Sequence, residues 1–236
     1  MTKLSHPEPA HPAGKELKMA TVYVSSRTAT LSSESNDVFY IQTHGILSIE
    51  QGGAILSDGS LYVFPLGSAI VNSGGRTLKG IVYSSAGMTV RSGGTATGVQ
   101  VYGDGRLDVM RGGHAADITL SSGGWVYVSR GTLYGIQVSG GTLELKDIAP
   151  AAPANSSFVR SAILNYGGIM NVGSKAVAYL TQIKNGVGAG DYNGDAKDDL
   201  LVRQKSTGML GCYASGDMAS WNTLGYGVDM NWTVIA

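Results

Sequence analysis

Cysteine and charge are both scarce in this sequence. The single cysteine, Cys212, excludes an intrachain disulfide. Charged residues make up only 14% of the 236 residues, and the 17 Lys and Arg balance the 17 Asp and Glu. A chain without excess positive charge lacks the electrostatic footprint of a protein that binds nucleic acid or an anionic membrane surface. We therefore expect no nucleic acid partner.

Long hydrophobic stretches are also missing. The sequence contains no run of 18 apolar residues, so we expect no transmembrane helix and no membrane insertion. The first 20 residues carry charges and prolines but no apolar core, and so do not resemble a signal peptide. We expect residues 1–20 to form a flexible N-terminal tail.

Glycine, unlike cysteine and the charged residues, is abundant. The 35 glycines are about twice the usual share, whereas only 6 prolines are present, and no Gly-X-Y register runs through the chain. Collagen is thereby excluded. Many glycines in a moderately apolar chain indicate many tight turns between short strands.

The glycines recur with a period near 19 residues. One series has a spacing of 19, and a second, offset series has spacings of 18, 19 and 17. The members of the two series are Gly75, Gly94 and Gly113, and then Gly87, Gly105, Gly124 and Gly141. Each repeat therefore has a short arm and a long arm, both ending at glycine.

Apolar and polar residues alternate along both arms, as they do in a strand with one buried face. In the short arms, the predicted inward positions are Met88, Val90, Leu107, Val109, Val126, Val128, Leu143 and Leu145, and the outward ones are Thr89, Asp108, Tyr127 and Glu144. In the long arms, the predicted inward columns are Ile81, Val99, Ile118 and Ile136, and Tyr83, Val101, Leu120 and Val138, with Val82, Gln100, Thr119 and Gln137 outward.

No arm can bury its apolar face alone, so like positions of successive repeats must stack about 4.8 Å apart. The sequence predicts an all-β protein, a right-handed parallel β-helix with about 19 residues per turn. A propeller blade needs about 40 residues and is excluded. We place the β-helix at 21–185, with a loop at 147–157 that could instead be a linker, and a small β module at 186–236.

The stretch from Val71 to Gly113, VNSGGRTLKGIVYSSAGMTVRSGGTATGVQVYGDGRLDVMRGG, resembles the AIDA-type adhesin repeats of autotransporter passenger domains. The resemblance covers about 45–145 and, more weakly, 21–185. It implies a bacterial surface or secreted protein that serves as a stalk or adhesive surface. Complete autotransporters also carry an N-terminal export signal and a C-terminal membrane domain, which we do not find in this sequence.

In some members of that family, a dedicated heptosyltransferase adds sugars to Ser and Thr of the β-helix. The resemblance therefore implies a glycosyltransferase as a modifying partner. Ser92 and Ser122, each in an SGG turn, are the candidate glycosylation sites. The alternative is that these hydroxyls only cap turns.

The C-terminal segment contains a candidate calcium loop, DYNGDAKDD. Side-chain oxygens of Asp191, Asn193, Asp195 and Asp199, with the carbonyl of Lys197, would surround a calcium ion. The pattern resembles an FG-GAP or VCBS-type repeat, with Ala196 in place of the usual glycine. The alternative is a solvated turn without metal. The module could also cap the last turn, because an open solenoid end exposes unpaired strand edges.

Three outward aromatic residues, Trp125, Tyr127 and Tyr134, could form a glycan-binding face. Aromatic ladders that stiffen the sheet are the alternative. The chain is thus predicted to be a non-enzymatic extracellular structural or adhesin-type protein, with a host or cell-surface glycan or protein as partner.

Two other functions remain open at this stage. A carbohydrate-active β-helix enzyme would need clustered carboxylates, whereas Asp108 and Glu144 are separated by a whole turn. A subunit of a self-assembling extracellular filament, or another homo-oligomer, is the third hypothesis.

Overall fold

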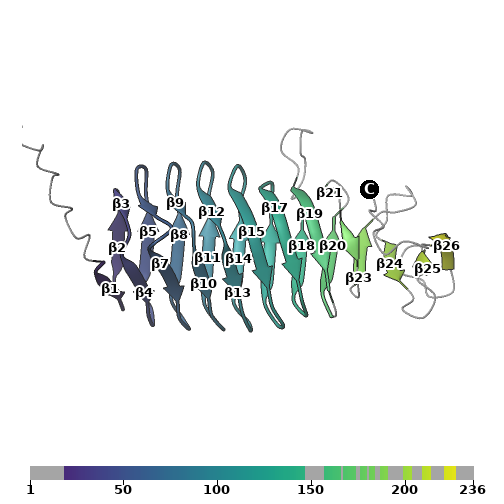
Figure 1. Ribbon diagram of the computed structural model, residues 1–236, viewed down its shortest axis with the longest axis horizontal. Helices are drawn as coiled ribbons and strands as arrows, with labels where there is room; N and C mark the ends of the chain where they lie inside the picture. Colours follow the sequence, from purple (N-terminus) through teal and green to yellow (C-terminus); the bar gives the residue numbers. More distant parts are fainter. Residues whose placement is uncertain are drawn as a thin grey trace, which may run out of the picture.

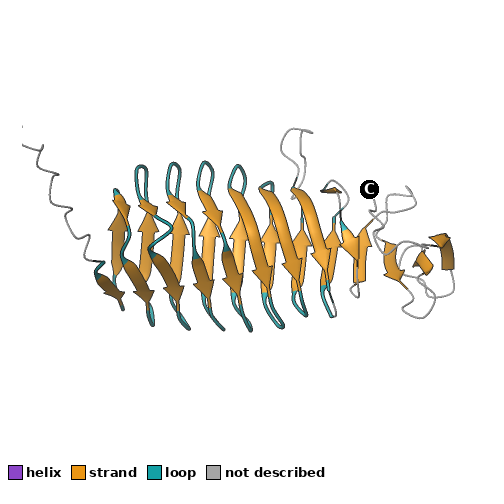
Figure 2. Ribbon diagram, in the orientation of Figure 1, coloured by secondary structure: helices purple, strands orange, loops and turns teal. Residues whose placement is uncertain are grey.

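The computed structural model describes residues 19–146, 157–165, 167–173, 176–179, 181–183, 187–190, 199–203, 209–213 and 221–226. In the described residues the chain forms an elongated solenoid of about eight turns, stacked one beside the next along the long axis of Figure 1. These residues are strands and turns, without a helix (Figure 2). Accordingly, no described segment could cross a membrane as an apolar helix.

The strands form two sheets, with 14 and 12 strands in the described part of the chain. Sheet 1 contains β1 (Thr21–Val24), β3 (Glu34–Ser35), β4 (Val38–Ile41), β6 (Ala54–Ile55), β7 (Ser60–Val63), β9 (Arg76–Thr77), β10 (Gly80–Val82), β12 (Thr95–Thr97), β13 (Val99–Val101), β15 (His114–Leu120), β17 (Thr132–Val138), β19 (Phe158–Leu164), β21 (Val177–Tyr179) and β22 (Gln182–Ile183). Sheet 2 contains β2 (Thr28–Leu31), β5 (Ile46–Ile49), β8 (Ser68–Val71), β11 (Gly87–Val90), β14 (Arg106–Val109), β16 (Trp125–Val128), β18 (Thr142–Leu145), β20 (Ile169–Val172), β23 (Val187–Gly190), β24 (Asp199–Arg203), β25 (Met209–Tyr213) and β26 (Trp221–Tyr226).

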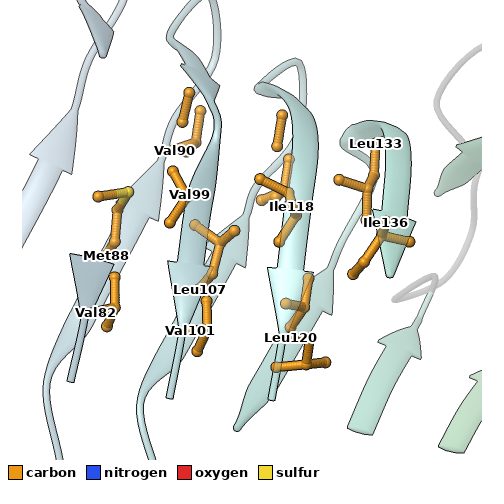
Figure 3. Close-up of a cluster of buried hydrophobic side chains, with 14 of the residues drawn as sticks. Val82, Met88, Val90, Val99, Val101, Leu107, Ile118, Leu120, Leu133 and Ile136 are labelled. Carbon is orange, nitrogen blue, oxygen red and sulfur yellow. The ribbon is translucent and has the colours of Figure 1, made fainter. Parts of the chain in front are cut away.

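The predicted stacking of like side chains is confirmed in sheet 2. Strands β11, β14, β16 and β18 pair in parallel, with Val90 beside Val109 and Val109 beside Val128. These three valines are fully buried. The interior between the sheets is filled by such rows, and Figure 3 shows Val82, Val101 and Leu120 following one another along successive turns. Dispersion contacts and exclusion of water from these rows hold the turns together.

Part of the long-arm prediction is wrong. Ile81 pairs with Gln100 and faces outward, whereas Val82 pairs with Val101 and is fully buried. Tyr83, predicted inward, is likewise on the outside and only partly buried. In a strand, a shift of one residue moves every side chain to the opposite face, and the predicted alignment of this one repeat was shifted by one residue.

Each early turn also has a third strand that the two-arm interpretation missed. The short strands β3, β6, β9 and β12 stack on one another beside β1, β4, β7, β10 and β13. In β15, β17 and β19 the two strands of a turn merge into one long strand, and the first of these pairs with both β12 and β13. The turn after β19 has two separate strands again, β21 and β22. The bend in the long strands lies at Asp117, Gly135 and Ser161, which have φ values of 53°, 65° and 63°. A left-handed residue turns the strand without interrupting the stack.

A three-residue insertion lies between β6 and β7. Ile55 pairs with Thr77 and Leu61 pairs with Gly80, so six positions in this turn match three in the next. After residues 147–156, which lie outside the described part, β19 pairs with β17 and the stack resumes.

The SGG turn at residues 92–94 needs both of its glycines, each for a different reason. Gly93 has a φ of 75°, which L-residues rarely adopt. Gly94 lies so close to the previous turn that a Cβ atom would be 2.4 Å from the Val71 carbonyl oxygen. The backbone amides of these turns also extend the hydrogen bonding between successive turns of the solenoid. Gly74 N–H donates to the Gly93 carbonyl, and Gly93 N–H donates to the Gly112 carbonyl.

Strand pairing changes from parallel to antiparallel at the C-terminal end. β23 pairs in parallel with β20, but antiparallel with β24, and β24, β25 and β26 continue antiparallel. An antiparallel extension covers the edge that the last parallel strand would otherwise expose. The predicted domain boundaries stay predictions, because much of 186–236 lies outside the described residues.

Candidate functional site

Strand β16 displays two of the predicted aromatic residues on the outer face of sheet 2. Val126 and Val128 point inward and are fully buried, so the alternation of the strand turns Trp125 and Tyr127 outward. Trp125 pairs with Arg106 and Thr142, and Tyr127 pairs with Asp108 and Glu144. These six residues of β14, β16 and β18 are called the aromatic face below.

Contacts across the strands order this face. The Arg106 Nε donates to Asp108 Oδ1 at 2.7 Å, and the Arg106 guanidinium lies 5.4 Å from the centre of the Tyr127 ring. Cation–π and ion-pair contacts at an exposed surface are individually weak, but together they fix the arginine in one position. The Trp125 side chain is 47% exposed. The result is a rigid surface with an exposed indole beside charged hydrogen-bonding groups.

Tyr134 does not belong to this face. It lies on β17 in sheet 1, is 47% exposed, and packs edge-to-face against Phe158 with ring centres 6.2 Å apart. The predicted trio of aromatics is therefore divided between the two sheets. Tyr134 is close to Trp125 and Tyr127 in the sequence but lies on a different surface, because consecutive arms of a solenoid turn face different directions.

A longer aromatic ladder, missed in the sequence, follows the outer surface of sheet 1. Its rings are stacked in two columns that meet where Tyr40 contacts both Tyr62 and Phe64. The members, in order along the axis, are Tyr23, Tyr40, Tyr62, Phe64, Tyr83 and Tyr102. The 19-residue spacing of Phe64, Tyr83 and Tyr102 was a signal that could have revealed it. Because these rings cover one another's faces, the ladder is suited to stiffening the sheet.

The two candidate glycosylation serines are both exposed but occupy different corners of the cross-section. Ser92 lies in the turn between β11 and β12, and Ser122 lies in the turn between β15 and β16. In Figure 1 the first kind of turn lines one long edge of the solenoid and the second kind lines the other. Their SGG turns are therefore not structurally equivalent, although their sequences match.

Of the predicted calcium ligands, Asp191, Asn193, Asp195 and Lys197 lie outside the described residues. Asp199 is the first residue of β24. Within the part of the chain that the structure describes, no group of three or more His, Cys, Asp or Glu residues could hold a metal ion. The calcium loop therefore stays a prediction from the sequence.

Asp108 and Glu144, the acids considered for catalysis, lie on β14 and β18 with Tyr127 between them in the register. Two strand spacings separate their Cα atoms by roughly 10 Å. Asp108 is already in contact with Arg106.

Comparison with known proteins finds a similarity among solved structures. No protein-family model and no curated protein matches the chain. Among solved structures, it is similar to a fragment of TibA hyper-glycosylated by TibC, with 27% identity and a TM-score of 0.50. The match covers 72% of this chain and 64% of that fragment, so it spans less than two thirds of the TibA fragment. The similarity supports the assignment of an all-strand parallel β-solenoid.

Proposed function

We propose that this chain is a non-enzymatic adhesin-type β-helix of a bacterial cell surface, and that its aromatic face binds glycan. The observation that carries the proposal is Trp125, a 47% exposed indole held on a rigid sheet beside Arg106. The resemblance of residues 45–145 to AIDA-type adhesin repeats supports the adhesin class and the surface location, and the similarity to the TibA fragment supports the fold.

The chemistry of the aromatic face matches that of a sugar. A pyranose ring has an apolar face that packs on an indole, and hydroxyls that pair with fixed charged groups. Asp108 and Glu144 accept hydrogen bonds, whereas Arg106 and Thr142 donate them. The parallel ladder fixes these side chains in advance, so binding costs little ordering entropy.

Glycan-array binding followed by calorimetry tests this proposal. Trp125→Ala should abolish or weaken binding to the best array ligand, by roughly tenfold or more for the loss of a central aromatic contact. Tyr23→Ala is the matched control, because Tyr23 is 55% exposed in sheet 1 and far from the aromatic face in sequence and register. Equal binding by wild type and Trp125→Ala would contradict the proposal.

The non-enzymatic part is tested separately. If the chain only binds, incubation with its glycan ligand should release no product. New reducing ends or unsaturated uronic ends would instead indicate a hydrolase or a lyase.

Modification by a glycosyltransferase is also proposed, supported by the TibC-catalysed glycosylation of TibA. Ser92 and Ser122 are both exposed and accessible to such an enzyme. Mass spectrometry of the chain co-expressed with a transferase of this class should locate sugars on one or both turns. Sugars confined to other residues would remove these two serines as candidates.

The calcium loop at 191–199 is proposed to bind one calcium ion and to stabilise the C-terminal segment. Support comes from the alternation of oxygen-bearing side chains at Asp191, Asn193 and Asp195.

A further inference from the structure

A second surface feature lies at the corner where the strands of sheet 2 end. An open depression of about 460 Å³ is lined by Arg91, Ser92, Met110, Arg111, Ser129 and Arg130. It follows β11, β14 and β16, whose last buried residues are Val90, Val109 and Val128. We call these six residues the arginine corner.

The stacking of successive turns brings positively charged residues together at this corner. Successive turns place Arg91, Met110 and Ser129 at one position of the stack, and Arg111 and Arg130 at the next position along the chain. Lys146 follows Ser129 in the first stack, since its N–H donates to the Val128 carbonyl just as the Ser129 N–H donates to that of Val109. A formally neutral chain thus carries a local cluster of cations on one edge.

Among the described residues, no acidic side chain lines this corner. The ion pairs among the described residues are those of Arg76 and Arg106, so neither Arg91 nor Arg111 has a carboxylate within ion-pair distance there. Both side chains are exposed. Arg91 Nη1 donates to the Asn72 side-chain oxygen at 3.3 Å, and the Asn72 amide nitrogen donates to Glu50 Oε1 at 2.9 Å, so Arg91 meets an amide and not a carboxylate directly.

We propose that the arginine corner binds the carboxylate or sulfate group of an acidic sugar. This rests on the proposed glycan-binding function and names the class of its ligand. Guanidinium groups bind planar or tetrahedral oxyanions through paired charge-assisted hydrogen bonds. Met110, 38% exposed, adds an apolar surface for the sugar ring, and the Ser92 hydroxyl adds a hydrogen-bonding group.

The corner is continuous with the aromatic face. Ser129 directly follows β16, and Met110 directly follows β14, so the corner begins where the strands of the aromatic face end. Trp125, at the other end of β16, is four residues before Ser129, a span of about 13 Å in extended backbone. An acidic oligosaccharide of a few sugar units could therefore contact Trp125 at one end and the arginines at the other.

Calorimetry with two defined probes tests the proposal: a heparin-derived tetrasaccharide, and cellotetraose as its neutral counterpart. Wild type should bind the heparin tetrasaccharide more tightly, with an affinity that falls as salt is added. The double variant Arg91→Gln, Arg111→Gln should lose about tenfold or more of that affinity, since charge-assisted hydrogen bonds are lost. Arg76→Gln, an exposed arginine of sheet 1, is the control and should change it by less than about twofold.

The outcomes separate this inference from the glycan-binding function. If the probes bind equally and the arginine variants have no effect, the acidic-sugar site is overturned, while binding that depends on Trp125 would still stand. If the arginine variants lose heparin binding and Trp125→Ala does not, the acidic-sugar site is supported and the aromatic face is not. Binding to phosphatidylglycerol vesicles without binding to the tetrasaccharide would overturn the sugar assignment.

Discussion

The rings of Tyr40 and Tyr62 stack with their centres 5.0 Å apart and their planes 12° from parallel, on the neighbouring strands β4 and β7. Tyr40 also stacks on Tyr23 at 5.2 Å and on Phe64 at 5.9 Å. It therefore joins the two columns of the aromatic ladder on sheet 1. Removing it separates the first turn from the columns that follow.

Replacement of Tyr40 by alanine should loosen the N-terminal turns. Three ring contacts at roughly 0.5–1.5 kcal/mol each, reduced by partial exposure, give a loss of about 1–3 kcal/mol. Tyr23→Ala removes one contact and should cost less. Because solenoid repeats can unfold separately, amide hydrogen exchange in β1 and β4 is the suitable measurement. Unchanged protection in Tyr40→Ala would show that the ladder does not stabilise these turns.

Two glycine-to-alanine variants provide a matched pair. In Gly94→Ala the new Cβ atom would lie 2.4 Å from the Val71 carbonyl oxygen, so the backbone must move, at a cost of about 1–3 kcal/mol. At Gly87 nothing lies within 4 Å of the position that a Cβ atom would occupy, and its φ is not in the left-handed region. Gly87→Ala should be neutral, or more stable by up to about 1 kcal/mol. Denaturant titrations of both variants would decide, and equal losses would contradict the close approach at Gly94.

The interior rows are tested by Leu107→Ala. Leu107 is fully buried between Met88 and Val126 of the neighbouring turns, so its truncation leaves a cavity and should cost about 2–5 kcal/mol. Thr89→Ala, on the outer face of β11, should change stability by less than about 0.5 kcal/mol. The difference between the two melting temperatures measures the contribution of one interior position.

Sequence periodicity was sufficient for β11, β14, β16 and β18, because each of these strands has four residues and apolar residues recur at both inward positions. It failed at β10 because Ala86, not Gly87, occupies the position of Gly105: Ala86 N–H donates to the Tyr83 carbonyl as Gly105 N–H donates to that of Tyr102. The prediction took Gly87 as the turn residue. This shifted the register by one residue, so that Ile81 was placed inward and Val82 outward. The two- and three-residue strands such as β9 were missed because so few residues show no alternation.

The candidate site was only partly predictable for a related reason. Trp125 and Tyr127 share a strand, and alternation within one strand can be read locally. The positions of Tyr134 and Arg111 on the surface depend on where each turn bends and on which turns meet at the same corner of the solenoid. The number of residues per turn alone does not determine either of these. The arginine corner arises from two neighbouring stack positions, and each of its arginines comes from a different turn of the solenoid.

Calcium should stabilise the C-terminal segment specifically. A ligand that binds only the folded state stabilises it by RT ln(1 + [L]/Kd), about 2.7 kcal/mol at a hundredfold excess over Kd. Calcium should therefore raise the melting transition of this segment and EGTA should lower it, while Asp195→Asn should reduce the response by removing a charged ligand. Magnesium is the control, because it prefers a smaller octahedral shell of oxygens and should protect less well. A melting profile that is identical in calcium and EGTA would leave the loop as a solvated Asp- and Asn-rich turn, and any stability of the segment would then come from the antiparallel pairing of β23 with β24.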